Sequence, residues 1–327
     1  MGTPRPTPDA GQEIPGRRPP RGAPAGCRRG ARLALGALIL LAGALALDAA
    51  ALAGRITRVP VQMPDGPGET WVLVGEDSRA HLPDGAPTSA FGSTDAVPGS
   101  RADVVLVVHS AGDRTTVLSV PRDVAVTRAR TPGRLALSWL DGPQSTVDAL
   151  CGLGIAADHL VAVDLAGFTA VVDALGGLDV DVPAPVRDPA AGLQLATAGP
   201  RHVDGATALA LVRSRNPQQL VDGRWVPAPV DPDGRATAAA GVLSALADAA
   251  EGSLTRPWRL QALAWAASGE LTVDSETSSR ELLGVLHTEL GRMTVLPVGP
   301  PVAGTLVRFP TDTTGRAVVA AGMSCEP

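Results

Sequence analysis

The fold of this chain is decided by the stretch ADVVLVVHSAGDRTTVLSVPRD, residues 102–123. Two runs rich in β-branched residues are separated only by the residues GDR, which predicts two strands joined as a hairpin. Pro121 cannot donate a ladder hydrogen bond, so the second strand is expected to end there. Arg122 and Asp123 follow directly. Such a pair of unlike charges is either a surface ion pair of little energetic value or part of a ligand site at the edge of a sheet.

Extended and helical patterns interleave on both sides of this hairpin. Strands are predicted at residues 71–74, before a polar turn, and in HLVAVDL, LDVDVPAPV and MTVLPV; helices are predicted in GPQSTVDALCGLGI, AGFTAVVDALGG, VDGATALALVR, DGRATAAAGVLSALADAA and SSRELLGVLHTEL. Gly176 and Gly177 are expected to end the second of these helices. Because strands alternate with helices and two strands form a hairpin, we expect an α/β fold with a mixed β-sheet flanked by helices. Residues 216–232 are expected to form a long loop.

The composition limits the classes of partner. The net charge is −5, and all 28 positive residues are arginine. A GC-rich genome would produce this arginine bias, although arginine is also the better side chain for two-pronged contacts with phosphate. With no basic DNA-reading element, no nucleic-acid partner is expected.

The N-terminal region has the pattern of a membrane anchor. Residues 33–53 form an apolar run long enough to cross a bilayer as a helix. More arginines precede this run than follow it, which predicts a cytoplasmic N-terminus and a single-pass protein of the cell membrane. The expected organisation is a disordered cytoplasmic segment (1–32), a transmembrane signal anchor (33–53), a linker (54–69) and an extracytoplasmic domain (70–327). The alternative is a cleaved signal peptide, because ALA at 51–53 precedes Gly54.

The cysteines agree with an exported domain. Cys27 precedes the apolar run, whereas Cys151 and Cys325 follow it. An oxidising compartment permits the latter two to form a disulfide, which would tie down the C-terminal end. Two free buried thiols are the alternative.

Charged residues recur at predicted strand ends and loop starts. Several arginines and two or three aspartates that converge on one edge of a sheet would suit a pyrophosphate with a divalent cation. If residues 213–215 are extended, Arg213 and Arg215 point to the same face. Solvated loop charges are the alternative interpretation. The residues concerned are Asp77, Arg79, Arg101, Asp103, Arg122, Asp123, Arg213, Arg215 and Arg235.

The order and wording of these motifs resemble the LytR-CpsA-Psr (LCP) family of cell-envelope proteins. The matching pieces are VGEDSR, SRADVVLVV, LSVPRDVAV, GRLALSWLDGP, DHLVAVDLAGFTAVVDALGGLDVDVP, GPRHVDGATALALVRSR and DPDGR. They extend over roughly residues 70–300, and the arginine and alanine richness is typical of a high-GC bacterium such as an actinobacterium.

The resemblance implies a phosphotransferase at the outer face of the membrane. It would move a glycopolymer from an undecaprenyl-pyrophosphate carrier to peptidoglycan in cell wall assembly, with an apolar tunnel for the polyprenyl tail. The catalytic residues carried over are Asp103, Arg122 and Asp123; Asp103 and Asp123 would hold Mg²⁺, and Asp123 would accept the proton of the attacking hydroxyl. The pyrophosphate would be bound by Arg79, Arg101, Arg122, Arg213, Arg215 and Arg235.

Two departures from the family pattern favour a second hypothesis. After GR the family usually has I-x-R-Q, but residues 236–239 are ATAA, and Ala136 replaces a usual asparagine. A catalytically weakened protein that binds polyprenyl-pyrophosphate carriers or assists active paralogues is therefore the alternative to an active transferase. A transcriptional regulator is disfavoured, because the domain lies outside the membrane.

Overall fold

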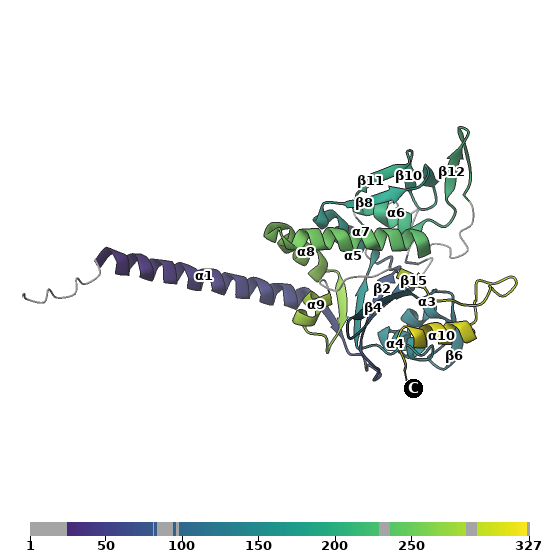
Figure 1. Ribbon diagram of the computed structural model, residues 1–327, viewed down its shortest axis with the longest axis horizontal. Coiled ribbons are helices and arrows are strands. Elements are labelled where there is room, and N and C mark those ends of the chain that lie inside the picture. The colour runs from purple at the N-terminus through teal and green to yellow at the C-terminus, as the bar shows by residue number, and fades with distance from the viewer. Residues whose placement is uncertain are drawn as a thin grey trace, which may run out of the picture. The chain divides into compact units, whose positions relative to one another are not determined.

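The computed structural model describes residues 25–80, 82–83, 94–95, 98–228, 236–285 and 293–325 (Figure 1). The chain divides into two compact units, Met1–Ala50 and Ala51–Pro327. Disorder was predicted for residues 1–32. Of these, residues 1–24 lie outside the described part of the chain, and residues 25–32 belong to a helix.

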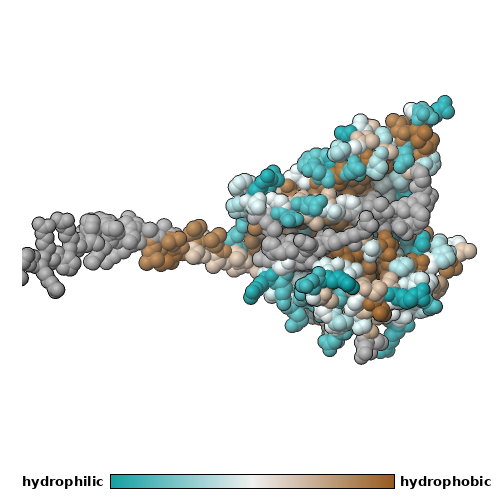
Figure 2. Space-filling model, viewed as in Figure 1, coloured by the Kyte–Doolittle hydropathy of each residue, from teal (hydrophilic) through white to brown (hydrophobic). Residues whose placement is uncertain are grey.

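That helix is α1 (Ala25–Arg55). Over Leu38–Arg55 it is long and apolar enough to cross a membrane, and none of this stretch is buried against the protein. Figure 2 shows mostly hydrophobic side chains along the part of α1 that is not drawn in grey. The predicted apolar helix is therefore present.

The larger unit is built on a seven-stranded sheet in the order β1-β14-β7-β2-β3-β4-β15. The predicted hairpin is confirmed, since β3 and β4 pair antiparallel with Ala111 opposite Arg114. The pairs β1–β14, β2–β7 and β4–β15 are parallel, so the sheet is mixed, as expected. The strands are β1 (Thr57–Val59), β2 (Glu69–Glu76), β3 (Ala102–Ala111), β4 (Arg114–Ser119), β7 (His159–Val163), β14 (Leu271–Asp274) and β15 (Met293–Val295).

One face of the sheet packs against short helices. Val105 and Val107 of β3 belong to a buried cluster with Leu135 and Leu150. On the other face, Val108 packs with further apolar side chains. The alternation follows from the two-residue period of a strand. The elements on the first side are β5 (Ala125–Arg128), β6 (Thr131–Arg134), α3 (Leu135–Ser138), the 3₁₀ helix η1 (Trp139–Asp141), α4 (Pro143–Cys151) and α10 (Asp312–Ala320).

A second apolar core lies among helices and a two-stranded ribbon. Val172, Leu178, Val242 and Leu263 are buried together there. Gly176 ends α5 in the left-handed conformation, as predicted, with φ +89°. The elements are α5 (Leu165–Leu175), β8 (Leu178–Val182), β11 (Gly199–Val203), α6 (Gly205–Arg213), α7 (Ala236–Leu254) and α8 (Pro257–Ser268); a shorter helix, α9 (Ser279–Val285), follows β14.

The predicted loop at 216–232 is wrong over its first half. It contains the hairpin of β12 (Gln218–Val221) and β13 (Arg224–Pro227), which joins β9 (Val186–Asp188) and β10 (Leu193–Leu195) in a four-stranded sheet. Asp222 and Gly223 form its tip with φ values of +48° and +72°. Asp-Gly between two strands is a strong hairpin signal that the sequence analysis did not use. Figure 2 shows apolar side chains gathered below the hydrophilic tip of this hairpin.

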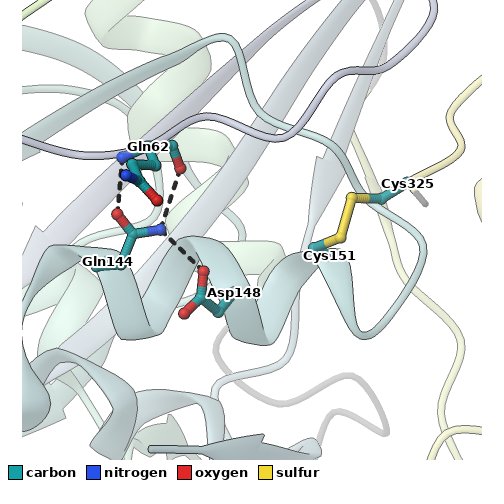
Figure 3. The surroundings of a disulfide bond; sticks show 5 residues. All are labelled: Gln62, Gln144, Asp148, Cys151 and Cys325. Atoms are coloured by element: carbon teal, nitrogen blue, oxygen red, sulfur yellow. Dashed lines mark hydrogen bonds between the residues drawn. A yellow bond between two sulfur atoms is a disulfide. The ribbon is translucent and has the colours of Figure 1, made fainter. Parts of the chain in front are cut away.

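The segment expected to be a linker is also structured. Residues 57–59 form β1 of the main sheet, and Val61 is buried in the core beneath it. Gln144 of α4 holds this segment at Gln62, accepting from its N–H at 2.7 Å and donating to its carbonyl at 3.0 Å (Figure 3). The folded unit therefore begins before residue 70.

A disulfide joins Cys151 at the end of α4 to Cys325 near the C-terminus (Figure 3). Their Cα atoms are 5.2 Å apart, and 174 residues separate them along the chain. The cross-link therefore closes a long loop that includes most of the folded unit.

Replacing Cys151 with serine is expected to lower the free energy of unfolding by about 2–4 kcal/mol, because the unfolded chain regains the entropy of the open loop. Urea denaturation measures this loss. Cys325→Ser and the double variant should show the same loss within error. A double variant much less stable than either single variant would contradict a role for the disulfide itself.

Candidate functional site

The charges singled out from the sequence meet at one edge of the main sheet. β3 runs antiparallel to both of its neighbours, so its first residues lie beside the ends of β2 and β4. A β-bulge at Gly75/Glu76 ends the ladder between β2 and β3, and the Asp77 N–H then donates to the Arg101 carbonyl at 2.8 Å. The Val120 N–H donates to Val105 before Pro121 ends β4. Asp77, Arg101, Asp103 and Arg122 are thereby held at one edge by the topology of three strands.

Arg122 lies between the two aspartates expected to act with it. Its Nη1 is 2.5 Å from Asp103 Oδ1, and its Nε is 3.6 Å from Asp123 Oδ2. Arg134 completes the group, with Nη1 at 2.7 Å from Asp123 Oδ1. All three residues of the Asp103–Arg122–Asp123 group have side chains that are less than one fifth exposed. The unlike charges after β4 are therefore part of a partly buried network rather than a solvated surface pair.

Asp77 is buried at this edge. Arg79 Nη2 lies 3.0 Å from its Oδ2, while its Oδ1 is buried and makes no hydrogen bond within the described part of the chain. Burial raises the pKa of the Asp77 carboxyl, and the charge of Asp103 raises it further, whereas nearby arginines act in the opposite direction. Asp77 and Asp103 therefore lie close enough to repel each other, and a cation between them would relieve this repulsion.

Arg213 and Arg215, at and just after the end of α6, reach the same carboxylates, although not as expected. Residues 213–215 are not extended, because Arg213 is the last residue of α6 and Ser214 is its C-cap. Arg215 Nη2 is 3.4 Å from Asp103 Oδ2. Arg213 is close enough to act on the pKa of Asp77, and burial lowers the pKa of Arg213 itself. The helix end, rather than strand alternation, brings both arginines to the site.

Asp188 is a buried residue of the site that the sequence analysis missed. Its Oδ2 accepts from Ser214 Oγ at 2.9 Å and from the N–H groups of Arg215 and Asn216, both at 2.8 Å. Burial would raise the pKa of Asp188, but the hydrogen bonds from Asn216, Ser214 and Arg215 hold it below its usual value. The side chain at the end of β9 thus positions the turn that carries Arg215. The only local signal was Asp followed by Pro after an extended run.

Two further arginines, Arg101 and Arg235, were predicted to bind the pyrophosphate. Arg101 Nη1 is buried and, among the described residues, makes no hydrogen bond. A buried donor of this kind suits an anionic ligand that completes its hydrogen bonds. Arg235 lies outside the described residues.

The alanines that depart from the family pattern keep part of the expected architecture. Ala136 is buried in α3, and its N–H donates to the Arg122 carbonyl at 2.8 Å. The backbone support of Arg122 is therefore present without the asparagine side chain. Ala239 is buried in α7 and contributes no polar group.

A magnesium ion at this site would have to be bound by its aspartates. Within the described residues, no group of three or more His, Cys, Asp and Glu side chains could hold a metal ion. Mg²⁺, however, is often bound by one or two carboxylates together with substrate phosphates. Asp77 fits this requirement best, because its buried Oδ1 makes no hydrogen bond among the described residues. Asp103 lies close enough to repel Asp77, although both of its oxygens, like those of Asp123, already face arginine nitrogens.

Comparison with known proteins identifies the family. The sequence profile of the LytR_cpsA_psr family matches residues 57–224. The chain belongs to the LytR-CpsA-Psr family. A solved structure described as the LytR-Csp2A-Psr enzyme from Actinomyces oris is 36% identical, with a TM-score of 0.68, over 83% of this chain and 97% of that chain. The predicted family and the LCP-like α/β fold are therefore confirmed.

Two curated LCP relatives have names that refer to the cell wall. The "Probable cell wall biosynthesis protein LcpB" of Corynebacterium glutamicum is 34% identical over 171 residues, 49% of this chain and 40% of that protein. The polyisoprenyl-teichoic acid–peptidoglycan teichoic acid transferase TagU of Halalkalibacterium halodurans is 36% identical over 85 residues, 24% of this chain and 27% of that protein. The matches thus span less than half of either relative.

A more distant structure shares the LCP fold. It is described as TagT bound to LI-WTA and is 18% identical, with a TM-score of 0.55, over 80% of this chain and 96% of that chain.

Proposed function

We propose that this LCP protein transfers a glycopolymer from a polyprenyl-pyrophosphate carrier to peptidoglycan at the outer face of the cell membrane. The observation that carries the proposal is the cluster at the sheet edge, where Asp77 and Asp103 are surrounded by arginines. Arginine forks match phosphate oxygens, and paired carboxylates suit a magnesium ion shared with phosphate. The names of the LcpB and TagU relatives support a cell-wall transferase.

In the proposed reaction, an acceptor sugar hydroxyl attacks the phosphorus on the sugar side of the pyrophosphate. A phosphodiester forms, the bond to the second phosphate breaks, and polyprenyl monophosphate leaves with the proton that the hydroxyl loses. Arg122 and Arg215, held by Asp103, would bind phosphate oxygens and stabilise the charge that develops on them. When bound by Asp77 and Asp103, Mg²⁺ would supply further neutralisation of phosphate charge.

Asp123 is better suited to hold Arg122 than to accept a proton. Its two oxygens face Arg134 and Arg122, so its charge is already used in ion pairs. We therefore propose a positioning role for Asp123 in place of the expected role as proton acceptor.

The test is release of phosphate from geranylgeranyl pyrophosphate by the purified protein, with and without Mg²⁺, alongside Asp103→Ala. Release that requires Mg²⁺ and is lost in Asp103→Ala would support the transferase. Release that persists unchanged in Asp103→Ala would overturn the assignment of this site.

The replacement of a polar pair by Ala238 and Ala239 favours one alternative, a protein that binds the carrier without turnover. In that case the lipid pyrophosphate would still bind, in an Arg122-dependent manner, but no phosphate would be released. Binding and release measured on the same preparation distinguish the two functions.

If Asp77 rather than Asp123 binds Mg²⁺ together with Asp103, Mg²⁺ should stabilise the protein through Asp77. This can be measured without catalytic turnover. Mg²⁺ at a hundred times its Kd is expected to raise the free energy of unfolding by about 2.7 kcal/mol. Asp77→Asn should remove most of this increase, because the amide offers the cation no charge. Asp123→Asn should retain it. Loss of the increase in Asp123→Asn but not in Asp77→Asn, measured by thermal denaturation, would restore the original assignment.

A further inference from the structure

Helix α8 has an unusual exposed face. Two of the five tryptophans of the chain, Trp258 and Trp265, lie seven residues apart on it, which places them on the same side of a helix. Trp258 is 69% exposed and Trp265 is 39% exposed. Leu263, on the other side of the helix, is buried in the core with α5 and α7. The helix is thus held by its apolar face while it presents tryptophan to the outside.

Arg55 connects this face to the end of the apolar helix. Its guanidinium lies over the Trp265 ring, 5.0 Å from the ring centroid. Its Nε donates to Ser268 Oγ at 3.1 Å, and its Nη2 donates to the Trp265 carbonyl at 3.3 Å. Arg55 is also the last residue of α1 and of the candidate membrane span Leu38–Arg55. The side chain of the last residue of the candidate span therefore contacts the C-terminal half of α8 directly.

The chemistry of this patch matches the headgroup region of a bilayer. Tryptophan is enriched at membrane–water interfaces, where its ring meets the glycerol region and its N–H can still donate a hydrogen bond. An arginine near the end of a span keeps its charged group at the membrane–water interface. Both residue types occur together here, beside the residue at which the candidate membrane span ends.

We propose that α8 is an interfacial helix, whose tryptophan face lies in the headgroup region of the outer leaflet. The inference rests on the membrane placement that the proposed function includes, and it adds a second contact with the bilayer besides α1. The folded unit would then be held against the lipid surface that carries the polyprenyl-linked substrate, rather than tethered by one flexible point.

The test is quenching of tryptophan fluorescence in the full-length protein reconstituted into phosphatidylcholine vesicles with 6,7-dibrominated acyl chains. Part of the emission should be quenched, at most the share of two tryptophans among five. Trp258→Phe/Trp265→Phe should remove most of the quenchable emission. The matched control is Trp225→Phe in β13, because Trp225 also lies under an arginine, Arg187, at 4.6 Å. It should leave the quenchable emission unchanged.

Unchanged quenching in the double variant, or an equal loss in Trp225→Phe, would overturn the inference. Phosphate release should be measured on the same proteins. Because the residues that form the site do not lie on α8, this measurement tests the proposed function independently of the interfacial helix. Activity with no quenching from Trp258 and Trp265 would refute the interfacial helix alone. Quenching without activity would refute the transferase alone.

Discussion

Replacing Arg122 with alanine is expected to lower phosphate release from a polyprenyl pyrophosphate by about 100- to 1,000-fold, the effect typical of removing one preorganised donor to a developing negative charge. Arg122 is placed to act on the phosphates because Asp103 and Asp123 hold its guanidinium from two sides. The loss should appear mainly in kcat, since the interaction strengthens as charge develops in the transition state.

Two variants test whether this effect depends on the shape of the guanidinium. Arg122→Lys keeps the positive charge but cannot contact Asp103 and Asp123 through different nitrogens, so it should recover only a small part of the lost activity. Arg128→Ala is the matched control, because Arg128 of β5 forms a comparable ion pair with Asp141 of η1, which does not involve the aspartates of the site. Wild-type activity in Arg122→Ala would refute its catalytic role, and full recovery in Arg122→Lys would refute the requirement for a forked group.

Replacing Asp188 with alanine is expected to lower the free energy of unfolding by about 1.5–3 kcal/mol, the contribution typical of hydrogen bonds to a charged group. The side chain is buried, and its loss would leave the Ser214 hydroxyl and the N–H groups of Arg215 and Asn216 without their acceptor. Because the same turn carries Arg215 to Asp103, activity should fall with stability.

The comparison for this prediction is Asp204→Ala. Asp204 caps α6 by accepting from the Thr207 N–H at 2.8 Å, and loss of such a cap costs about 1 kcal/mol. Urea denaturation should therefore rank Asp188→Ala as clearly the more destabilising of the two. Equal losses would show that Asp188 acts as an ordinary turn residue.

The pH dependence of this contribution has a defined sign. Hydrogen bonds hold the pKa of Asp188 below its usual value despite burial, so the folded state keeps the carboxylate ionised at lower pH than the unfolded chain does. The stabilisation is therefore present above the unfolded pKa of about 3.9 and is lost as the pH falls through the lower folded pKa. The stability difference between wild type and Asp188→Ala should shrink below that point.

Local patterns in the sequence were sufficient to predict the main elements of the fold. The short GDR gap predicted the β3–β4 hairpin, and the paired glycines predicted the end of α5, because turns and caps depend on neighbouring residues. The motifs at strand ends also located the residues of the sheet edge, since a strand that ends in a charged residue brings that charge to the edge. The Asp-Gly signal of β12–β13 was equally local and was overlooked.

The partners of these residues depended on contacts between distant segments. The Asp103–Arg122 ion pair joins residues 19 apart, Asp188 binds donors 26 to 28 residues away, and Arg215 reaches Asp103 across 112 residues. The same is true of Arg55 and Trp265, which lie 210 residues apart in the chain. A sequence can specify which side chains reach an edge, because strand and helix periods are local. Which of them share a proton, a cation or a hydrogen bond is decided only when the packed strands fix the distances between them.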